Sequence, residues 1–300
     1  MDHKQVSRKR RRGDRYDAVR VRGLDSMHRL MTCMMPNRCD NEAYILVSAD
    51  TTKIDAYVAK KNAENPEHRY TMYQVILGAL GRTVELRPLM NRFIMGDYYY
   101  DRTRITMSMV AKKAFNDKSS EGIAILEYDP ADARGPIGQM HDKLCDFTYR
   151  LRTEGESDST TDDMEIICKL PGVLVHCFIR LLAWLDRHSK MPKSLAKVDP
   201  YNSTVFISNI GSLGLSAGYH HLSNWGTNSI FVIVGERKLT PHYDERGNVT
   251  MRPTVELGLT LDERIGDGYY FAKTVKLLKK LLENPELLDR PGAEGIEIDD

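Results

Sequence analysis

Three stretches of the sequence hold side chains that can donate, accept or move a proton. Residues 262–268 read DERIGDG, at a strand end that enters a helix, and residues 206–214 read FISNIGSLG, where a strand runs into a turn of small residues. Residues 219–221 lie in a loop rich in Gly, Ser and Asn. Carboxylates, hydroxyls and imidazoles are the groups of acid–base and oxyanion chemistry, although no stretch alone specifies a reaction. The side chains concerned are Glu263, Asp267, Ser208, Asn209, His220 and His221.

Each of these residues also has a purely structural interpretation. An Asp-Gly pair such as Asp267-Gly268 is a common helix cap, and a Ser-Asn pair at a strand end often satisfies only backbone groups. Adjacent residues on an extended segment point to opposite faces, so at most one of His220 and His221 is expected to face a shared site. The other histidines and the cysteines show no metal-ligand spacing, so we predict no metal site.

The composition is that of an ordinary globular protein. The 300 residues include 43 Lys+Arg and 42 Asp+Glu, for a net charge of +1, and 41% are hydrophobic. These values exclude a collagen, a disordered chain and a purely electrostatic nucleic-acid binder. Five cysteines without a dense spacing pattern favour reduced thiols and a cytoplasmic setting. Neither a signal peptide nor a membrane span is expected, because the most apolar stretch, residues 170–185, is short and contains His176 and Arg180.

The two ends carry opposite charge. We expect a basic arm at residues 1–19, a core at 20–288 and an acidic tail at 289–300. The simplest interpretation is two solvated tails. The arms can instead pair with each other or with neighbouring subunits, and the basic arm can contact CoA phosphates or, less favoured, nucleic acid.

Strand-like and helix-like periodicities alternate in the core, which is typical of a mixed α/β layer fold. Residues 153–163 are polar and are expected to form a surface loop, and a bend is expected at Pro171-Gly172. The expected helices cover residues 50–62 with the cap, 71–86, 137–152, 164–188 and 268–283. The expected strands cover residues 43–49, 91–95, 98–101, 104–110, 122–128, 205–208, 229–236 and 249–260.

Several segments, in order, resemble the catalytic core of the dihydrolipoyl acyltransferases of 2-oxoacid dehydrogenase complexes, relatives of chloramphenicol acetyltransferase. That family has an FTISNLG segment, an INPP…AILAVG segment, and a DHRVIDG segment followed by an amphipathic helix and an ExPxLLL tail. The similar segments here are residues 206–214, 223–235 and 262–288, with 23–31 and 87–100 resembling the opening helix and the FPELNxRF segment. The resemblance implies a two-layer α/β sandwich with a mixed sheet, of the chloramphenicol acetyltransferase type.

The resemblance also implies a reaction. In the family a histidine removes the proton of a CoA or dihydrolipoyl thiol, a serine stabilises the oxyanion, and an aspartate four residues after the histidine organises the site. In this sequence the serine falls on Ser208, the aspartate on Asp267 and the histidine on Glu263. Asn209, His220 and His221 fall near the expected substrate channel. CoA or acyl-CoA is then the expected substrate, with no tightly bound cofactor.

Glutamate at position 263 changes the expected chemistry. Proton transfer from a thiol of pKa about 8.5 to an ordinary glutamate of about 4.3 is uphill by on the order of 6 kcal/mol, about twice the cost of transfer to a histidine. Three interpretations of Glu263 follow. It is a base whose pKa is raised by burial, or it is an inactivating substitution in a scaffold kept for assembly or binding. In the third interpretation His220 or His221 acts as the base in its place.

The resemblance further implies a homotrimer, or a larger assembly of trimers, with sites between subunits. The chain shows neither a lipoyl domain nor a Pro/Ala-rich linker, so acyl groups are expected from a separate lipoyl carrier or not at all. A lipoyl carrier and 2-oxoacid dehydrogenase subunits are the partners that the resemblance implies. The stretch from 153 to 200 is longer than the family expects, and its apolar content predicts an added packed element.

Overall fold

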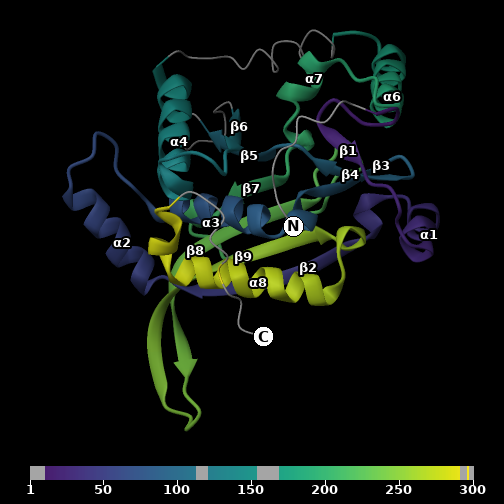
Figure 1. Cartoon of the computed structure of the whole chain (residues 1–300). Coiled ribbons are helices and arrows are strands. Elements are labelled where there is room, and N and C mark those ends of the chain that lie inside the picture. The colour runs from purple at the N-terminus through teal and green to yellow at the C-terminus, as the bar shows by residue number, and fades with distance from the viewer. Residues whose placement is uncertain (1–10, 113–120, 154–168, 291–295, 297–300) are drawn as a thin grey trace.

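A six-stranded mixed sheet forms the centre of the computed structural model, which describes residues 11–112, 121–153, 169–290 and 296 (Figure 1). Its strands are β2 (Glu42–Asp50), β5 (Ile105–Lys112), β6 (Glu121–Tyr128), β7 (Val205–Asn209), β8 (Ile230–Tyr243) and β9 (Val249–Asp262). They lie in the order β2-β9-β8-β7-β5-β6. β7 is parallel to β5 and β8, and the other neighbours are antiparallel. The prediction of an α/β fold with a mixed sheet is confirmed.

Helices cover one face of this sheet. They are α2 (Thr52–Ala63), α3 (Met72–Leu86), α4 (Gly135–Thr153) and α8 (Gly268–Glu283), and Figure 1 shows α3 and α8 lying across the strands. Thr71 and Gln74 form a capping box that fixes the start of α3. Alternate strand residues such as Val205, Ile207 and Val232 are buried under these helices. The main hydrophobic core therefore lies between the sheet and one helical layer.

The opposite face of the sheet is partly covered by the loop of residues 214–222. The ring of Tyr219 lies 5.2 Å from that of Tyr44 on β2. A Cβ atom at Gly258 of β9 would overlap the carbonyl oxygen of Gly218, so only glycine permits this close approach. The loop that follows Ser208 thus crosses the face of the sheet away from the helices.

A small sheet packs beside the large one and anchors the start of the described chain. It consists of β1 (Ala18–Arg20), β4 (Tyr98–Arg102) and β3 (Arg92–Met95), in that order. Arg15 is buried and donates to the carboxylate of Asp186 at 2.8 Å and to that of Asp17 at 3.1 Å. The interpretation of the basic arm as a solvated tail is therefore wrong for Arg15, because two carboxylates offset the cost of covering its charge. Residues 1–10 lie outside the described chain.

The described residues also form α1 (Ser26–Met34), α6 (Gly172–Arg187) and α7 (Lys193–Val198), and Figure 1 shows α6 and α7 at the top of the molecule and α1 at its right. The start of α6 at Gly172 agrees with the predicted bend. The sequence predicts a packed element here, yet α6 leaves Val173, Leu181 and Trp184 at least half exposed. Short 3-10 helices cover Arg38–Asp40, Pro88–Asn91, Pro200–Asn202, Gly211–Leu213, Glu263–Ile265 and Pro285–Leu288.

The ends of β8 and β9 form a hairpin that projects from the body of the molecule (Figure 1). β8 continues to Tyr243, beyond the predicted strand end at 236, because its outer half is stabilised by pairing with β9 outside the body of the protein. Residue 153, the first of the predicted loop at 153–163, is the last residue of α4, and the rest of that loop and most of the acidic tail lie outside the described residues. Within the described chain, no helix combines the length and apolar character needed to span a membrane.

Candidate active site

Strand β7 places Ser208 on the face of the sheet away from the helices. Val205 and Ile207 point into the main core, so Phe206 and Ser208 alternate to the other face. Asn209 accepts a hydrogen bond from the backbone N–H of Ser212 at 3.2 Å, and its carbonyl accepts from the Ser212 hydroxyl at 3.0 Å. Among the described residues the Ser208 hydroxyl has no hydrogen-bond partner, whereas Asn209 is held in the turn. Ser208 can therefore donate to a ligand.

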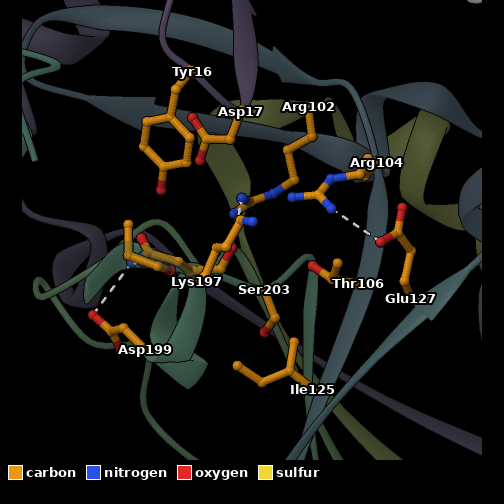
Figure 2. Close-up of a pocket in the computed structure, with 12 residues that line it drawn as sticks. Tyr16, Asp17, Arg102, Arg104, Thr106, Ile125, Glu127, Lys197, Asp199 and Ser203 are labelled. Carbon is orange, nitrogen blue, oxygen red and sulfur yellow. Dashed lines mark hydrogen bonds and ion pairs between the residues drawn. The ribbon is translucent and has the colours of Figure 1, made fainter. Parts of the chain in front are cut away.

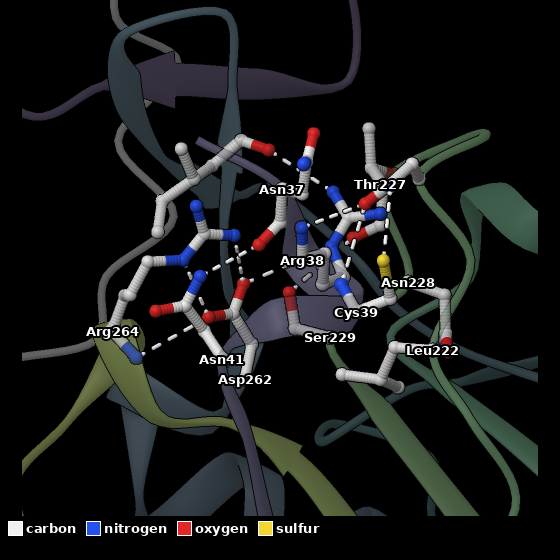
Figure 3. Close-up of polar contacts among 12 residues, drawn as sticks. Asn37, Arg38, Cys39, Asn41, Leu222, Thr227, Asn228, Ser229, Asp262 and Arg264 are labelled. Atoms are coloured by element: carbon white, nitrogen blue, oxygen red, sulfur yellow. Dashed lines mark hydrogen bonds and ion pairs between the residues drawn. The ribbon is translucent and has the colours of Figure 1, made fainter. Parts of the chain in front are cut away.

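A buried charge network underlies the segment that contains Glu263 (Figure 3). Arg264 donates to both carboxylate oxygens of Asp262, at 2.8 and 2.7 Å, and all of these side-chain atoms are buried. Nε of Arg38 lies 3.7 Å from the same carboxylate. Burial lowers the pKa of Arg38 to about 10, with Asp262 acting in the opposite direction. The carboxylate of Asp262 thus joins two buried guanidinium groups.

The same network ties together distant parts of the chain. Arg38 donates to the carbonyl oxygens of Gly226 at 3.3 Å and Ile94 at 3.0 Å, and Arg264 donates to the carbonyl oxygen of Met35 at 2.8 Å. These bonds hold the end of β9 against a loop, a strand and the residues after α1. The backbone next to Glu263 is therefore held in place, whereas the Glu263 side chain makes no hydrogen bond or ion pair with the described residues.

Glu263 and Asp267 lie at the surface of the single chain. Glu263 is exposed, and its backbone N–H donates to the carbonyl oxygen of Asn41 at 2.9 Å. Asp267 is exposed and is the N-cap of α8, where its carboxylate accepts from the Tyr270 N–H at 2.7 Å. The structural interpretation of Asp267 as a helix cap is thus realised. Among the described residues of one chain, nothing buries the Glu263 carboxylate as a retuned base would require.

The two histidines pack against each other rather than pointing apart. Their ring centroids are 4.4 Å apart, and the His220 ring also stacks on Phe231 at 4.1 Å. The prediction that they face opposite sides is wrong, because residues 215–223 form an irregular loop and not a strand. His220 is half-buried and its Nδ1 lies 2.8 Å from the carbonyl oxygen of His221, whereas His221 is exposed.

Within one chain, Ser208 and Glu263 are far apart. Ser208 pairs with Ile233, which pairs with Gly258, five residues before Glu263. Strands about 4.8 Å apart with a rise of about 3.3 Å per residue place the two Cα atoms on the order of 20 Å apart. β7 and β9 run in opposite directions, so the two residues lie toward opposite ends of the sheet. His220, on Phe231, lies over β8 between them.

Sequence reasoning missed Arg38, Asp262 and Arg264 as a group. Asp262 and Arg264 flank the candidate base, which is the only local signal. Arg38 lies in a polar stretch, and its partners at positions 94, 226 and 262 come from distant parts of the sequence.

Comparisons with known proteins confirm the resemblance to the dihydrolipoyl acyltransferase core. Residues 187–289 match the family model for the catalytic domain of the 2-oxoacid dehydrogenases acyltransferase. No curated protein matches this sequence.

Solved structures share the fold over most of the chain. A probable dihydrolipoamide acetyltransferase from Listeria monocytogenes is 14% identical, with a TM-score of 0.57, covering 93% of this chain and 98% of that one. The dihydrolipoamide acetyltransferase of Azotobacter vinelandii is 15% identical, with a TM-score of 0.58, covering 89% and 93%. The cubic core of a pyruvate dehydrogenase multienzyme complex is 15% identical, with a TM-score of 0.52 and the same coverage. At these identities the likeness establishes the fold.

Proposed function

We propose that this chain is a CoA-dependent acyltransferase-like protein of the 2-oxoacid dehydrogenase acyltransferase family, with Glu263 at the position of the catalytic histidine. The match over residues 187–289 carries the proposal, because it includes both β7 with Ser208 and the segment from Glu263 to Asp267. The study of the Azotobacter enzyme concerns a serine, a histidine and an asparagine in its catalytic mechanism. The corresponding set here is Ser208, Glu263 and Asp267, so two of the three positions differ.

The proposed site forms between copies of the chain. A hydroxyl and a carboxylate on the order of 20 Å apart cannot act on one thioester, so a second copy must bring its Glu263 to Ser208. Large side chains on the same side of the sheet as Ser208 are exposed and could contact such a copy: Tyr44 is 54% exposed, Leu46 is 51% exposed and Tyr219 is 49% exposed. We propose a homotrimer. The surface around Ser208 of one copy would contact the different surface around Glu263 of the next, and such a contact forms a closed ring when the rotation between neighbouring copies allows closure.

In this proposal Ser208 donates its hydroxyl hydrogen to the oxyanion that forms when a thiol attacks the thioester carbonyl. Glu263 would take the proton of that thiol, which belongs to CoA or to dihydrolipoamide on a separate carrier. When the oxyanion collapses, the carbon–sulfur bond of the original thioester breaks, and Glu263 would return the proton to the leaving thiolate. Asp267 already accepts a backbone hydrogen bond at the start of α8, so it orients the helix rather than an imidazole. Thiol activation is then the slow step, because proton transfer from a thiol to an ordinary carboxylate is unfavourable in free energy.

A non-catalytic trimeric core is the second candidate function. It is favoured by the exposure of Glu263 together with the use of Asp267 as a helix cap. Such a protein would keep the fold and its surfaces for a partner or an acyl ligand, and lose the transfer reaction.

Acetyl transfer from acetyl-CoA to dihydrolipoamide separates the two candidates. If Glu263 is the base, the native protein transfers acetyl groups and Glu263→Gln loses about 10²-fold in kcat, the smaller end of general-base contributions. Sedimentation of both proteins checks that the assembly is unchanged. Absence of transfer by the native protein supports the non-catalytic core, and transfer unaffected by Glu263→Gln assigns the base elsewhere, with His220 and His221 the next residues to replace.

A further inference from the structure

A pocket of about 260 Å³ opens at the other end of β7 from Ser208 (Figure 2). Its walls come from the segment before β1, from the start of β5 and the end of β6, and from α7 with the residues that follow it. Ser203, five residues before Ser208, is part of the lining, whereas Ser208, Glu263 and Asp267 are not. The pocket is therefore a different place from the proposed acyl-transfer site of this chain.

Two of the three carboxylates in the pocket already have cationic partners. Glu127 pairs with Arg104 at 3.0 Å, and Asp17 pairs with the buried Arg15 at 3.1 Å. The third, Asp199, accepts from neutral donors: the Tyr201 N–H at 2.9 Å, the Asn202 side chain at 3.3 Å and the Trp225 indole at 2.7 Å. Burial raises the pKa of Asp199 above its ordinary value, and the hydrogen bonds from the Tyr201 N–H and the Trp225 indole act against that shift.

Two of the cationic side chains in the pocket wall, Arg102 and Lys197, make no ion pair with the described residues. Arg102 donates to neutral acceptors, the carbonyl oxygens of Asn202 at 2.8 Å and Thr227 at 2.7 Å and the Thr227 hydroxyl at 2.9 Å. Burial lowers the pKa of Arg102 to about 9, and Asp17, which pairs with Arg15 together with Asp186, acts against that shift. In the described part of the chain, the Lys197 ammonium makes no ion pair.

Tyr16 adds a neutral donor. Figure 2 shows its hydroxyl directed toward the wall formed by α7 and the residues after it, below the guanidinium groups of Arg102 and Arg104. Burial is the main cause that raises the pKa of Tyr16, so the phenol stays protonated at neutral pH and can donate a hydrogen bond.

We propose that this pocket binds a small oxyanion, the carboxylate or phosphate group of a metabolite, through Arg102, Lys197 and Tyr16. A planar guanidinium presents paired N–H donors that match both groups, and an ammonium adds a second positive charge. Such a ligand would give Arg102 an anionic acceptor, because its hydrogen bonds in the described part of the chain go to neutral oxygens. The volume lies near the lower limit for small-molecule pockets, so the ligand is a compact one.

Isothermal titration calorimetry on the full chain tests this site, with inorganic phosphate and succinate as the two probes at constant ionic strength. Saturable binding of either probe is expected, and the probe that binds more tightly identifies the group. Lys197→Met is expected to weaken that binding at least tenfold. Lys193→Met is the matched control, because Lys193 is an exposed lysine on the same helix outside the lining, and it should bind like the native protein.

Arg102→Gln should abolish binding, but Arg102 also joins residues 202 and 227 and its loss can unfold the protein. Lys197→Met keeps the test decisive, since the Lys197 side chain is exposed and makes no hydrogen bond or ion pair with the residues that the structure describes. The proposal is overturned if neither probe binds, or if Lys197→Met and Lys193→Met bind the probe equally well.

Discussion

Glu263→His is expected to raise acetyl transfer between acetyl-CoA and dihydrolipoamide by about 10²-fold or more over the native protein. An imidazole with a pKa near 6.5 is largely unprotonated at neutral pH and accepts a thiol proton at a smaller energetic cost than a carboxylate does. A positioned general base raises the rate by about 10² to 10⁴-fold. The backbone at 263 is already fixed by its bond to Asn41 and by the buried network below it, so a histidine there starts from a defined position. Steady-state kinetics from pH 6 to 9 provide the measurement.

Removal of the Ser208 hydroxyl is the control for this gain. In the Glu263→His background, Ser208→Ala should lower kcat by about 10²-fold or more, the usual cost of losing one oxyanion donor. A Glu263→His protein as slow as the native one, with its assembly intact, would contradict the assignment of residue 263 to the base position.

Asp262→Asn is expected to destabilise the protein by about 3 to 5 kcal/mol, because breaking a buried ion pair leaves an uncompensated charge. Both Arg264 and Arg38 would then be buried without their carboxylate. Urea unfolding followed by circular dichroism, at one fixed protein concentration, measures the change.

Glu263→Gln is the matched control for stability. It removes a carboxylate from the adjacent position, but that carboxylate is exposed, so the unfolding free energy should change by less than about 0.5 kcal/mol. Equal stability of Asp262→Asn and the native protein would show that the network does not hold the end of β9.

Local patterns were enough to predict most of the fold. The apolar residues at helical spacing in 71–86 predict α3, and residues 229–236 predict the strand that forms the first half of β8. Element ends were less predictable, because β8 runs on to Tyr243 through pairing with β9, which depends on the partner strand.

The candidate site was predictable only in part. The motifs around Ser208 and Glu263 identify the two residues, but their separation follows from the strand order and direction, which place β8 between β7 and β9 and run β7 and β9 in opposite directions. Arg15 and Arg38 look like solvated charges in the sequence, and their burial depends on Asp186 and Asp262, more than 170 positions away along the chain. The exposed apolar side chains of α6 show that the single chain does not supply every packing partner that the sequence encodes.

A mixed assembly of two complementary chains tests the shared site most directly. One chain carries Glu263→His with Ser208→Ala, and the other is native, so the first lacks the hydroxyl and the second lacks the imidazole. The two chains are co-expressed with different tags, and the mixed assemblies are purified through both. Acetyl transfer should rise at least tenfold above that of either parent, because some sites combine the histidine of one chain with the serine of the other. A rate equal to the average of the two parents would mean that no site is shared between copies.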